Sequence, residues 1–268
     1  MAKAEYEDLI YEVKNQVATI TINRPDRMNA FQVNTYFEMI DALTRAGWDE
    51  DIAVIVLTGA GGRAFGVGGD SADKKSDRST RGILGVPVEE IHTLIRDVPK
   101  PVIAKVNGYA IGGGNVMATI CDMTIASDRS IFGQVGPKVG SVDPGFGTAY
   151  LARVVGEKKA REMWYLCRRY SAQEALEMGL VNKVVPEEDL DAEVDAWCAE
   201  IVARSPTAIA IAKRTFNADT ESIRGIANLG FQTVGLYYQT DEAKEGGSAF
   251  REKRDPDFRG VLKKSKSK

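Results

Sequence analysis

The sequence predicts an α/β fold of alternating strands and helices, followed by a helical C-terminal segment. Two observations support this prediction. Short apolar segments typical of buried strands alternate with segments of helical apolar spacing, roughly every 45 residues, through the first half of the chain. From about Gly147 onward, helical spacing dominates. We therefore divide the chain into an α/β body, residues 1–200, and a C-terminal helical segment, residues 201–268.

The first half opens with an expected hairpin. Leu9–Lys14 and Val17–Asn23 have the composition of strands, and Asn15-Gln16 is short enough to be a tight connection between them. The segment 32–45 carries apolar residues at helical spacing, whereas 53–58 is a continuous apolar run typical of a buried strand. The remaining elements expected here are the helix 88–97, the strand 102–106 after two prolines, the helix 112–121 and the strand 123–126.

The second half is expected to be mostly helical. Helices are predicted over 149–155, 157–167, 172–178 and most of 187–254, with one short strand over 181–185. The last helices carry apolar residues that must be buried against the body or against a neighbouring subunit: Ile209, Ile211, Phe216, Ile226, Leu229, Phe231 and Leu236. Lys263–Lys268 carries four lysines and is expected to be a disordered tail.

Composition excludes several classes of function. The 268 residues carry a net charge of −3, which argues against a general nucleic-acid binder. Three widely spaced cysteines without a CxxC pair argue against a disulfide framework or a zinc site and favour a reducing cytoplasm. The charged first residues show no signal peptide, and no apolar run is long enough for a bilayer, so we expect no membrane partner.

Two glycine-rich segments are the strongest functional signal. Ala64–Asp70 and Asn107–Asn115 each follow a predicted strand, and the second opens a helix. Glycine lets a ligand oxygen approach the backbone, and a helix N-terminus offers unpaired N–H donors. Such donors suit an oxygen that becomes negative during a reaction. Neither GxGxxG nor GxxxxGK[ST] occurs in them, so a nucleotide phosphate is disfavoured. Tight turns without a ligand remain the alternative.

The motif order resembles that of the enoyl-CoA hydratase/isomerase (crotonase) superfamily. The residues that carry the resemblance are Asn23-Arg24-Pro25, Asn29-Ala30-Phe31, Ala64-Phe65, Gly69-Asp70, Lys100-Pro101, Gly108–Gly114 and Cys121-Asp122, within about residues 6–260. The resemblance implies a spiral of ββα repeats, a C-terminal helical trimerisation region, and a homotrimer or homohexamer. It also implies an acyl-CoA substrate whose thioester oxygen is held by the N–H groups of Gly69 and Gly113. Coenzyme A is then part of the substrate, and no metal or other cofactor is required.

The hydratases of this superfamily place water with two glutamates, and neither is present here. The matching positions are Val116 and Gly136. Because neither residue can carry a proton, we expect no simple alkene hydration. An enoyl-CoA isomerase is disfavoured for the same reason, since its carboxylate usually occupies one of these positions.

Three further segments, 132–143, 158–167 and 236–242, resemble a smaller branch of the superfamily. This branch contains 1,4-dihydroxy-2-naphthoyl-CoA synthase, which closes a ring, and 2-ketocyclohexanecarboxyl-CoA hydrolase, which opens one with water. The loop Ser71–Leu84 has no aromatic residue and resembles the hydrolase more closely. Hydrolytic ring opening to a product such as pimeloyl-CoA is therefore expected. The synthase reaction is the alternative, and a non-catalytic crotonase-fold binding protein is the alternative from another class.

Within this resemblance, four residues are candidates for the chemistry. Asp143 matches the branch's catalytic aspartate and is expected to activate water or return the proton; otherwise it caps a turn. Ser141 and Tyr238 match polar positions of the synthase and are candidates to bind the ketone or the water. His92 is the single histidine, a candidate proton shuttle or else an ordinary helix side chain.

Two further sets of residues are expected to bind parts of the substrate or a small anion. Gln134, Gly136 and Trp164, together with Gly112, match a pocket in which the synthase binds bicarbonate; here it would hold bicarbonate or a water. The contacts expected for the nucleotide end of coenzyme A are Arg24, Ala30, Lys100 and Arg161, against the simpler reading of ordinary surface residues.

Overall fold

The computed structural model describes residues 6–70 and 81–266. Its larger sheet has six strands in the order β1-β2-β3-β5-β7-β10. Their bounds are β1 Leu9–Lys14, β2 Val17–Ile22, β3 Val54–Gly59, β5 Val102–Val106, β7 Met123–Ser127 and β10 Lys183–Val185. β1 and β2 form the expected antiparallel hairpin, and Asn15 and Gln16 take positive φ in its turn. The other pairs are parallel, so the predicted α/β class is confirmed.

A second sheet was not predicted. It has four strands of three residues each, in the order β4-β6-β8-β9: β4 Ala64–Gly66, β6 Tyr109–Ile111, β8 Ile131–Gly133 and β9 Arg169–Ser171. Such strands are too short to show an alternating pattern in sequence. β4, β6 and β8 are parallel, so their C-terminal ends meet at one edge of this sheet. The segments that leave this edge begin at Val67, Gly112 and Gln134.

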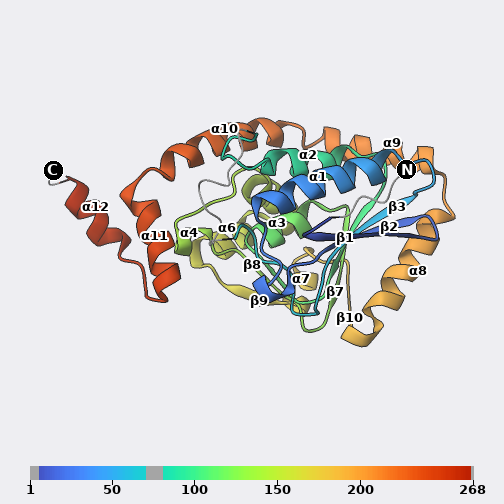
Figure 1. Cartoon of the computed structure of the whole chain (residues 1–268), viewed down its shortest axis with the longest axis horizontal. Helices are drawn as coiled ribbons and strands as arrows, with labels where there is room; N and C mark the ends of the chain where they lie inside the picture. Colours follow the sequence, from blue (N-terminus) through green and yellow to red (C-terminus); the bar gives the residue numbers. More distant parts are fainter. Residues whose placement is uncertain (1–5, 71–80, 267–268) are drawn as a thin grey trace.

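Helices cover the sheets and continue beyond them. The helices of the body are α1 Val33–Trp48, α2 Val88–Asp97, α3 Gly113–Ile120, α4 Gly136–Val139, α5 Leu151–Val155, α6 Glu157–Leu166, α7 Ala172–Glu177 and α8 Leu190–Val202. A π-helical turn, η3 Phe146–Tyr150, precedes α5, and short 3-10 turns lie at Pro25–Arg27 and Glu187–Asp189. The last helices are α9 Pro206–Ala218, α10 Ser222–Tyr237, α11 Asp241–Glu252 and α12 Phe258–Lys266. In Figure 1, α10 passes over the body and α11 and α12 reach the end of the molecule away from β1–β3.

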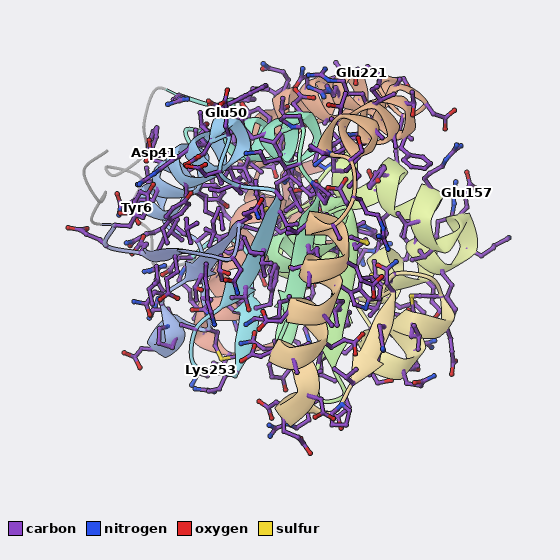
Figure 2. The ribbon with its side chains drawn as sticks, turned by 90° about the vertical axis from the view of Figure 1, so that its right-hand side faces the viewer. Tyr6, Asp41, Glu50, Glu157, Glu221 and Lys253 are labelled. Carbon is purple, nitrogen blue, oxygen red and sulfur yellow. The ribbon has the colours of Figure 1, made fainter. Side chains whose placement is uncertain are left out.

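The inner strands β3, β5 and β7 of the six-stranded sheet are buried on both faces. Every residue of β3 is buried, which explains its continuous apolar sequence. Ile55 and Leu57 face the main core with α1, α2 and α3, whereas Val54 and Val56 belong to a smaller cluster under α8. Charged side chains lie at the periphery, as Figure 2 shows for the labelled glutamates. None of the described helices is long and apolar enough to cross a membrane.

The C-terminal segment is helical as far as Lys266 and leaves several apolar residues exposed. The tail at Lys263–Lys268 was expected to be disordered, but α12 continues through Lys266, so that expectation is wrong for the described part; 267–268 lie outside it. Of the apolar residues expected to be buried, Phe231 is buried in the body. Five others on α9 and α10 remain exposed in the single chain: Ile211, Phe216, Ile226, Leu229 and Leu236.

A partly buried ion pair links α9 to the body. The Lys213 ammonium donates to the carbonyls of Ile95 and Lys100 at 2.7 and 2.8 Å, and to Asp122 Oδ2 at 2.7 Å. All three of its N–H groups are therefore used, at a site where Lys213 is 6% exposed. The same Oδ2 of Asp122 also accepts the backbone N–H of Val102 at the start of β5, at 2.7 Å.

Replacing Lys213 with methionine should destabilise the protein by about 2 kcal/mol, because the substitution leaves a partly buried carboxylate and two backbone carbonyls without their donor. The free energy of unfolding from urea denaturation checks this expectation. Arg214→Met on the exposed side of the same helix is the control and should change little. A Lys213→Met protein as stable as the control would contradict the assigned role.

Candidate active site

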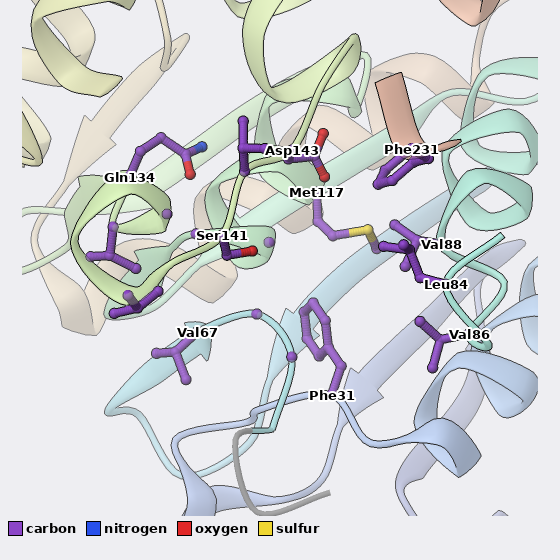
Figure 3. A pocket seen from close by; sticks show the side chains of 18 of the residues that line it. Phe31, Val67, Leu84, Val86, Val88, Met117, Gln134, Ser141, Asp143 and Phe231 are labelled. Carbon is purple, nitrogen blue, oxygen red and sulfur yellow. The ribbon is translucent and has the colours of Figure 1, made fainter. Parts of the chain in front are cut away.

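A cavity of about 320 Å³ opens at the edge where β4, β6 and β8 end. Its wall comes from segments far apart in the chain, including the two glycine-rich segments, α2, the segment after β8 and the end of α10. Figure 3 shows Asp143, Ser141 and Gln134 on one side, and Phe31, Val86 and Leu84 on the other. Of the expected site residues, those that line this cavity are Gly69, Gly113, Gly112, Asp143, Ser141, Tyr238, His92, Gln134, Gly136 and Trp164.

The two glycine-rich segments touch each other at the cavity. Gly68 has a φ of +82°, and a Cβ on it would lie 2.8 Å from the amide nitrogen of Gly113. Only glycine therefore permits this approach. Around Gly69, the chain is fixed by two bonds with Phe31, from Phe31 N to Gly68 O at 2.8 Å and from Asp70 N to Phe31 O at 2.9 Å. The intervening amide of Gly69 takes part in neither bond.

The N–H groups of Gly69 and Gly113 are available to a ligand. In the described part of the chain, neither donates a hydrogen bond to another backbone carbonyl. Gly113 is the first residue of α3, where the N–H groups have no partner within the helix and the helix dipole favours negative charge. The arrangement can therefore stabilise an oxygen that gains negative charge at this point of the cavity.

Asp143 is the carboxyl group that can exchange a proton here. Burial raises its pKa from the ordinary 3.8 to about 7, although the N–H of Gly147, 3.0 Å from Oδ1, opposes the rise. A Cβ on Gly147 would lie 2.8 Å from that of Asp143, so glycine is needed beside it. One carboxyl oxygen thus caps the turn η3, and no hydrogen bond within the described residues engages Oδ2. With this raised pKa, Asp143 can both donate and accept a proton at neutral pH.

The other carboxylate of the cavity, Asp70, is already neutralised. It forms ion pairs with Arg24 at 3.1 Å and with Arg27 at 2.8 Å. Arg24 also donates to the carbonyl of Ala30 and lies 3.5 Å from Asp8. The charge of Arg24 is therefore balanced by carboxylates within the protein.

The remaining residues expected at coenzyme A do not line the cavity. The Lys100 ammonium donates to the carbonyls of Ala46 and Asp49 at the end of α1. These carbonyls lack partners within the helix, so Lys100 caps it. Arg161 is exposed on α6 beside Glu157. Ala30 is buried and adjoins the cavity only through its neighbour Phe31.

Ser141 and Tyr238 meet across the fold. Their hydroxyl oxygens are 2.7 Å apart, although 97 positions separate them in sequence. Tyr238 is the C-cap of α10, so the last helices bring it to the segment that follows α4. Two adjacent hydroxyls next to Asp143 can donate to a carbonyl oxygen or hold a water.

His92 lies among aromatic rings rather than among charges. It is 2% exposed, with the ring centroids of Phe146 and Phe231 at 5.5 and 6.4 Å. Burial lowers its pKa to about 3, and its Nδ1 has no partner among the described residues. At neutral pH the imidazole is therefore uncharged and forms part of the apolar wall.

The residues expected to form the anion pocket are closely packed against their neighbours. Gln134 is 1% exposed, and its Nε2 has no partner in the described part of the chain. The indole N–H of Trp164, however, is donated to the carbonyl of Gly147. A Cβ on Gly136 would lie 2.5 Å from the carbonyl oxygen of Ser141, and Val116 is fully buried outside the cavity lining. A glutamate at Gly136 would therefore require its neighbours to move.

The sequence did not reveal the apolar wall of the cavity. It is formed by Phe31, Tyr36, Leu84, Val86, Val88, Ile91, Met117 and Phe231. Leu84 and Val86 lie in the turns before α2 and Val88 is its first residue, so no strand or helix period marks them in the sequence. The part of the preceding loop on which the comparison with the hydrolase depended, 71–80, lies outside the described residues. The wall can contact an apolar part of a ligand.

Comparison with known proteins places this geometry in context. Residues 12–261 match the family model described as enoyl-CoA hydratase/isomerase. The solved structure of an enoyl-CoA hydratase from Mycobacterium avium subsp. paratuberculosis K-10 is 30% identical, with a TM-score of 0.83 over 92% of this chain and 100% of that chain. An enoyl-CoA hydratase/isomerase from Pseudoalteromonas atlantica T6c is 29% identical, with a TM-score of 0.85 over 94% of this chain and 99% of that one.

Proposed function

The chain belongs to the enoyl-CoA hydratase/isomerase family, and we propose that it uses water to open a ring beside the thioester of an acyl-CoA. It has the crotonase fold, and the family supports an acyl-CoA thioester as the substrate. The proposed substrate resembles 2-ketocyclohexanecarboxyl-CoA. The proposed product is an open-chain dicarboxylic acid with one thioester, such as pimeloyl-CoA.

In the proposed reaction, Asp143 takes a proton from water as the water oxygen adds to the ring ketone. The bond between the former ketone carbon and the α-carbon of the thioester then breaks. Its electron pair moves into the thioester, whose enolate oxygen accepts the N–H groups of Gly69 and Gly113. Asp143 returns the proton to the α-carbon, so one water is consumed and the enzyme is regenerated. The hydroxyls of Ser141 and Tyr238 bind the ketone oxygen during addition.

The observation that supports this proposal is the half-buried carboxyl of Asp143, which lines the cavity and whose pKa is raised by desolvation to about 7. A group with this pKa is present in both protonation states at neutral pH and can serve as base and then as acid. The residues at the hydratase positions, Val116 and Gly136, supply no rival carboxylate. A non-catalytic binding protein would have no need of a carboxyl that burial makes costly to ionise.

Incubation with two substrates tests the proposal. The protein is supplied separately with 2-ketocyclohexanecarboxyl-CoA and with o-succinylbenzoyl-CoA, and the product masses are read. We expect a mass gain of one water on the first substrate and no change of the second. Loss of water from the second substrate alone would instead support the ring-closing synthase reaction. Activity on neither would favour the non-catalytic alternative.

The pH dependence follows from the raised pKa of Asp143. The base is the ionised form, so kcat/KM should rise with pH and level off above an apparent pKa near 7. An ordinary aspartate would leave the rate flat from pH 5 upward. His92 should not contribute an inflection above pH 5, because its pKa is lowered to about 3. Initial rates between pH 5 and 9 check this profile.

Removal of bicarbonate should leave the activity unchanged. The reason is that Asp143 can exchange the proton itself, while the indole N–H of Trp164 is already donated to Gly147. Dialysis into carbonate-free buffer, followed by addition of bicarbonate, provides the measurement. Activity that returns only with bicarbonate would assign the base to an ion held by Gln134.

We also propose that the chain works as a homotrimer or homohexamer in the cytoplasm. The exposed apolar residues of α9 and α10 support an interface between copies. Contacts of coenzyme A with Arg24, Ala30 and Lys100 are proposed from the family resemblance alone. Their bonds within the chain favour structural roles for the two cations.

A further inference from the structure

The residues that carry the proposed chemistry lie on a short segment, 140–147, between α4 and η3. Gly140 and Gly145, near its two ends, have φ values of +71° and +79°. Gly140 ends α4, and Ser141 N donates to the carbonyl of Gly136 at 2.8 Å. Asp143 is held by Gly147, at the other end of the same segment. Small displacements of this segment would therefore move both Ser141 and Asp143.

The C-terminal helices hold this segment from outside by contacts that only small residues allow. On the α10 side, a Cβ on Gly230 would overlap the ring of Pro144, and one on Gly145 would lie 2.5 Å from the Cβ of Ala227. On the α11 side, a Cβ on Gly140 would lie 2.5 Å from the carbonyl oxygen of Ala243.

Gly246 completes this contact from α11. A Cβ on Gly246 would overlap the amide nitrogen of Gly140. The atoms that these added Cβ atoms would meet belong to the backbone of Gly140 or to the rigid ring of Pro144. The segment 140–147 or the contacting helix must therefore shift if a methyl group is added. Tyr238, at the end of α10, forms a hydrogen bond with Ser141, so α10 also reaches into the cavity.

We propose that Gly230 and Gly246 are positioning residues, whose missing side chains let α10 and α11 hold the segment 140–147 with Asp143 and Ser141 at the cavity. The inference rests on the proposed function for the role of Asp143. It adds that residues outside the cavity, on helices that leave the body, set the position of the reacting groups. Neither glycine lines the cavity, so neither acts by touching the substrate.

The chain supplies a matched control on each helix. Gly225 of α10 has no atom within 4 Å of an added Cβ, and at Gly247 of α11 the nearest atom is the end of the flexible Arg251 side chain at 3.4 Å. Alanine at Gly225 and Gly247 should leave turnover within about twofold of the parent and raise stability slightly, because alanine favours the helix. Any general effect of replacing glycine in these helices is thereby measured.

The test compares Gly230→Ala and Gly246→Ala with these controls. We expect kcat to fall by about 10²-fold in the two test variants, with a smaller change of KM, because the reacting groups are displaced while the rest of the cavity is kept. The carboxyl carbon of Asp143 is followed by ¹³C NMR and assigned by its loss in Asp143→Asn. Its titration should move from about 7 toward the ordinary value as the segment shifts and solvent enters.

A second arm keeps the proposal testable if a variant folds poorly. Pro144→Gly removes the ring that the new methyl group meets, so Gly230→Ala should cost much less in that background. Wild-type kcat and an unchanged Asp143 titration in both test variants would overturn the inference. Failure of the parent to open the ring would overturn the proposed function, whereas the NMR titration would still decide the positioning role.

Discussion

Replacing Asp143 with asparagine should lower kcat by about 10²–10⁴-fold while the protein still folds. Asparagine is nearly the same size and can keep the bond from Gly147 to its side-chain oxygen. It cannot exchange a proton, so the water is not activated and the enolate is not protonated by this group. Turnover of 2-ketocyclohexanecarboxyl-CoA gives the rate, and circular dichroism gives the folded state. Turnover within a few-fold of the parent would remove Asp143 from the mechanism.

The same variant should be more stable than the parent at neutral and higher pH. In the folded parent the pKa of Asp143 is raised from 3.8 to about 7, so the folded protein binds more protons than the unfolded chain between these values. The stability of the parent therefore falls as the pH rises through this window, by a few kcal/mol at most. Asparagine does not titrate, so the difference in Tm should be small near pH 4 and largest above pH 7.

Replacing Gly69 with proline should lower kcat/KM by about 10²–10³-fold, because it removes one of the two N–H donors to the enolate oxygen. The φ of Gly69 is not in the positive region, and an added Cβ meets no atom within 4 Å. The bonds that fix this turn use the carbonyl of Gly68 and the amide of Asp70, so the fold loses no hydrogen bond. Steady-state kinetics measures the loss of kcat/KM, and thermal unfolding checks that the fold keeps its stability.

Gly69→Ala is the control for this variant. Alanine keeps the N–H group and fits the same open space, so its turnover should stay within about tenfold of the parent. An equal loss in both variants would show that bulk at this position, rather than the donor, limits the reaction. Activity of Gly69→Pro close to that of Gly69→Ala would contradict the oxyanion role of this amide.

The sequence predicted the larger sheet well because its strands are buried on both faces or paired in a hairpin, which leaves a clear pattern. The helix 88–97 and the strand 102–106 coincide with α2 and β5. The second sheet escaped prediction because three residues cannot show a period. Its strands are stabilised by pairing with distant segments, as in β8 with β9, rather than by local preference.

The site was predicted only in part, because some of its features depend on contacts between distant segments. Motifs local in the chain identified the glycines at 69 and 113, and the structure brings both to one cavity. The meeting of Ser141 with Tyr238 and the apolar surroundings of His92 depend on how α10 packs, which no local pattern encodes. The same holds for Gly136, where the reason that no glutamate fits is the nearby carbonyl of Ser141.

The most direct test of carbon–carbon cleavage follows the oxygen of water. The protein is incubated with 2-ketocyclohexanecarboxyl-CoA in H₂¹⁸O, and the product is analysed by mass spectrometry before and after fragmentation. We predict one ¹⁸O in the new free carboxyl group of an intact open-chain thioester, with no release of free coenzyme A. Free coenzyme A together with an unopened ring acid, or an unchanged substrate, would contradict the account.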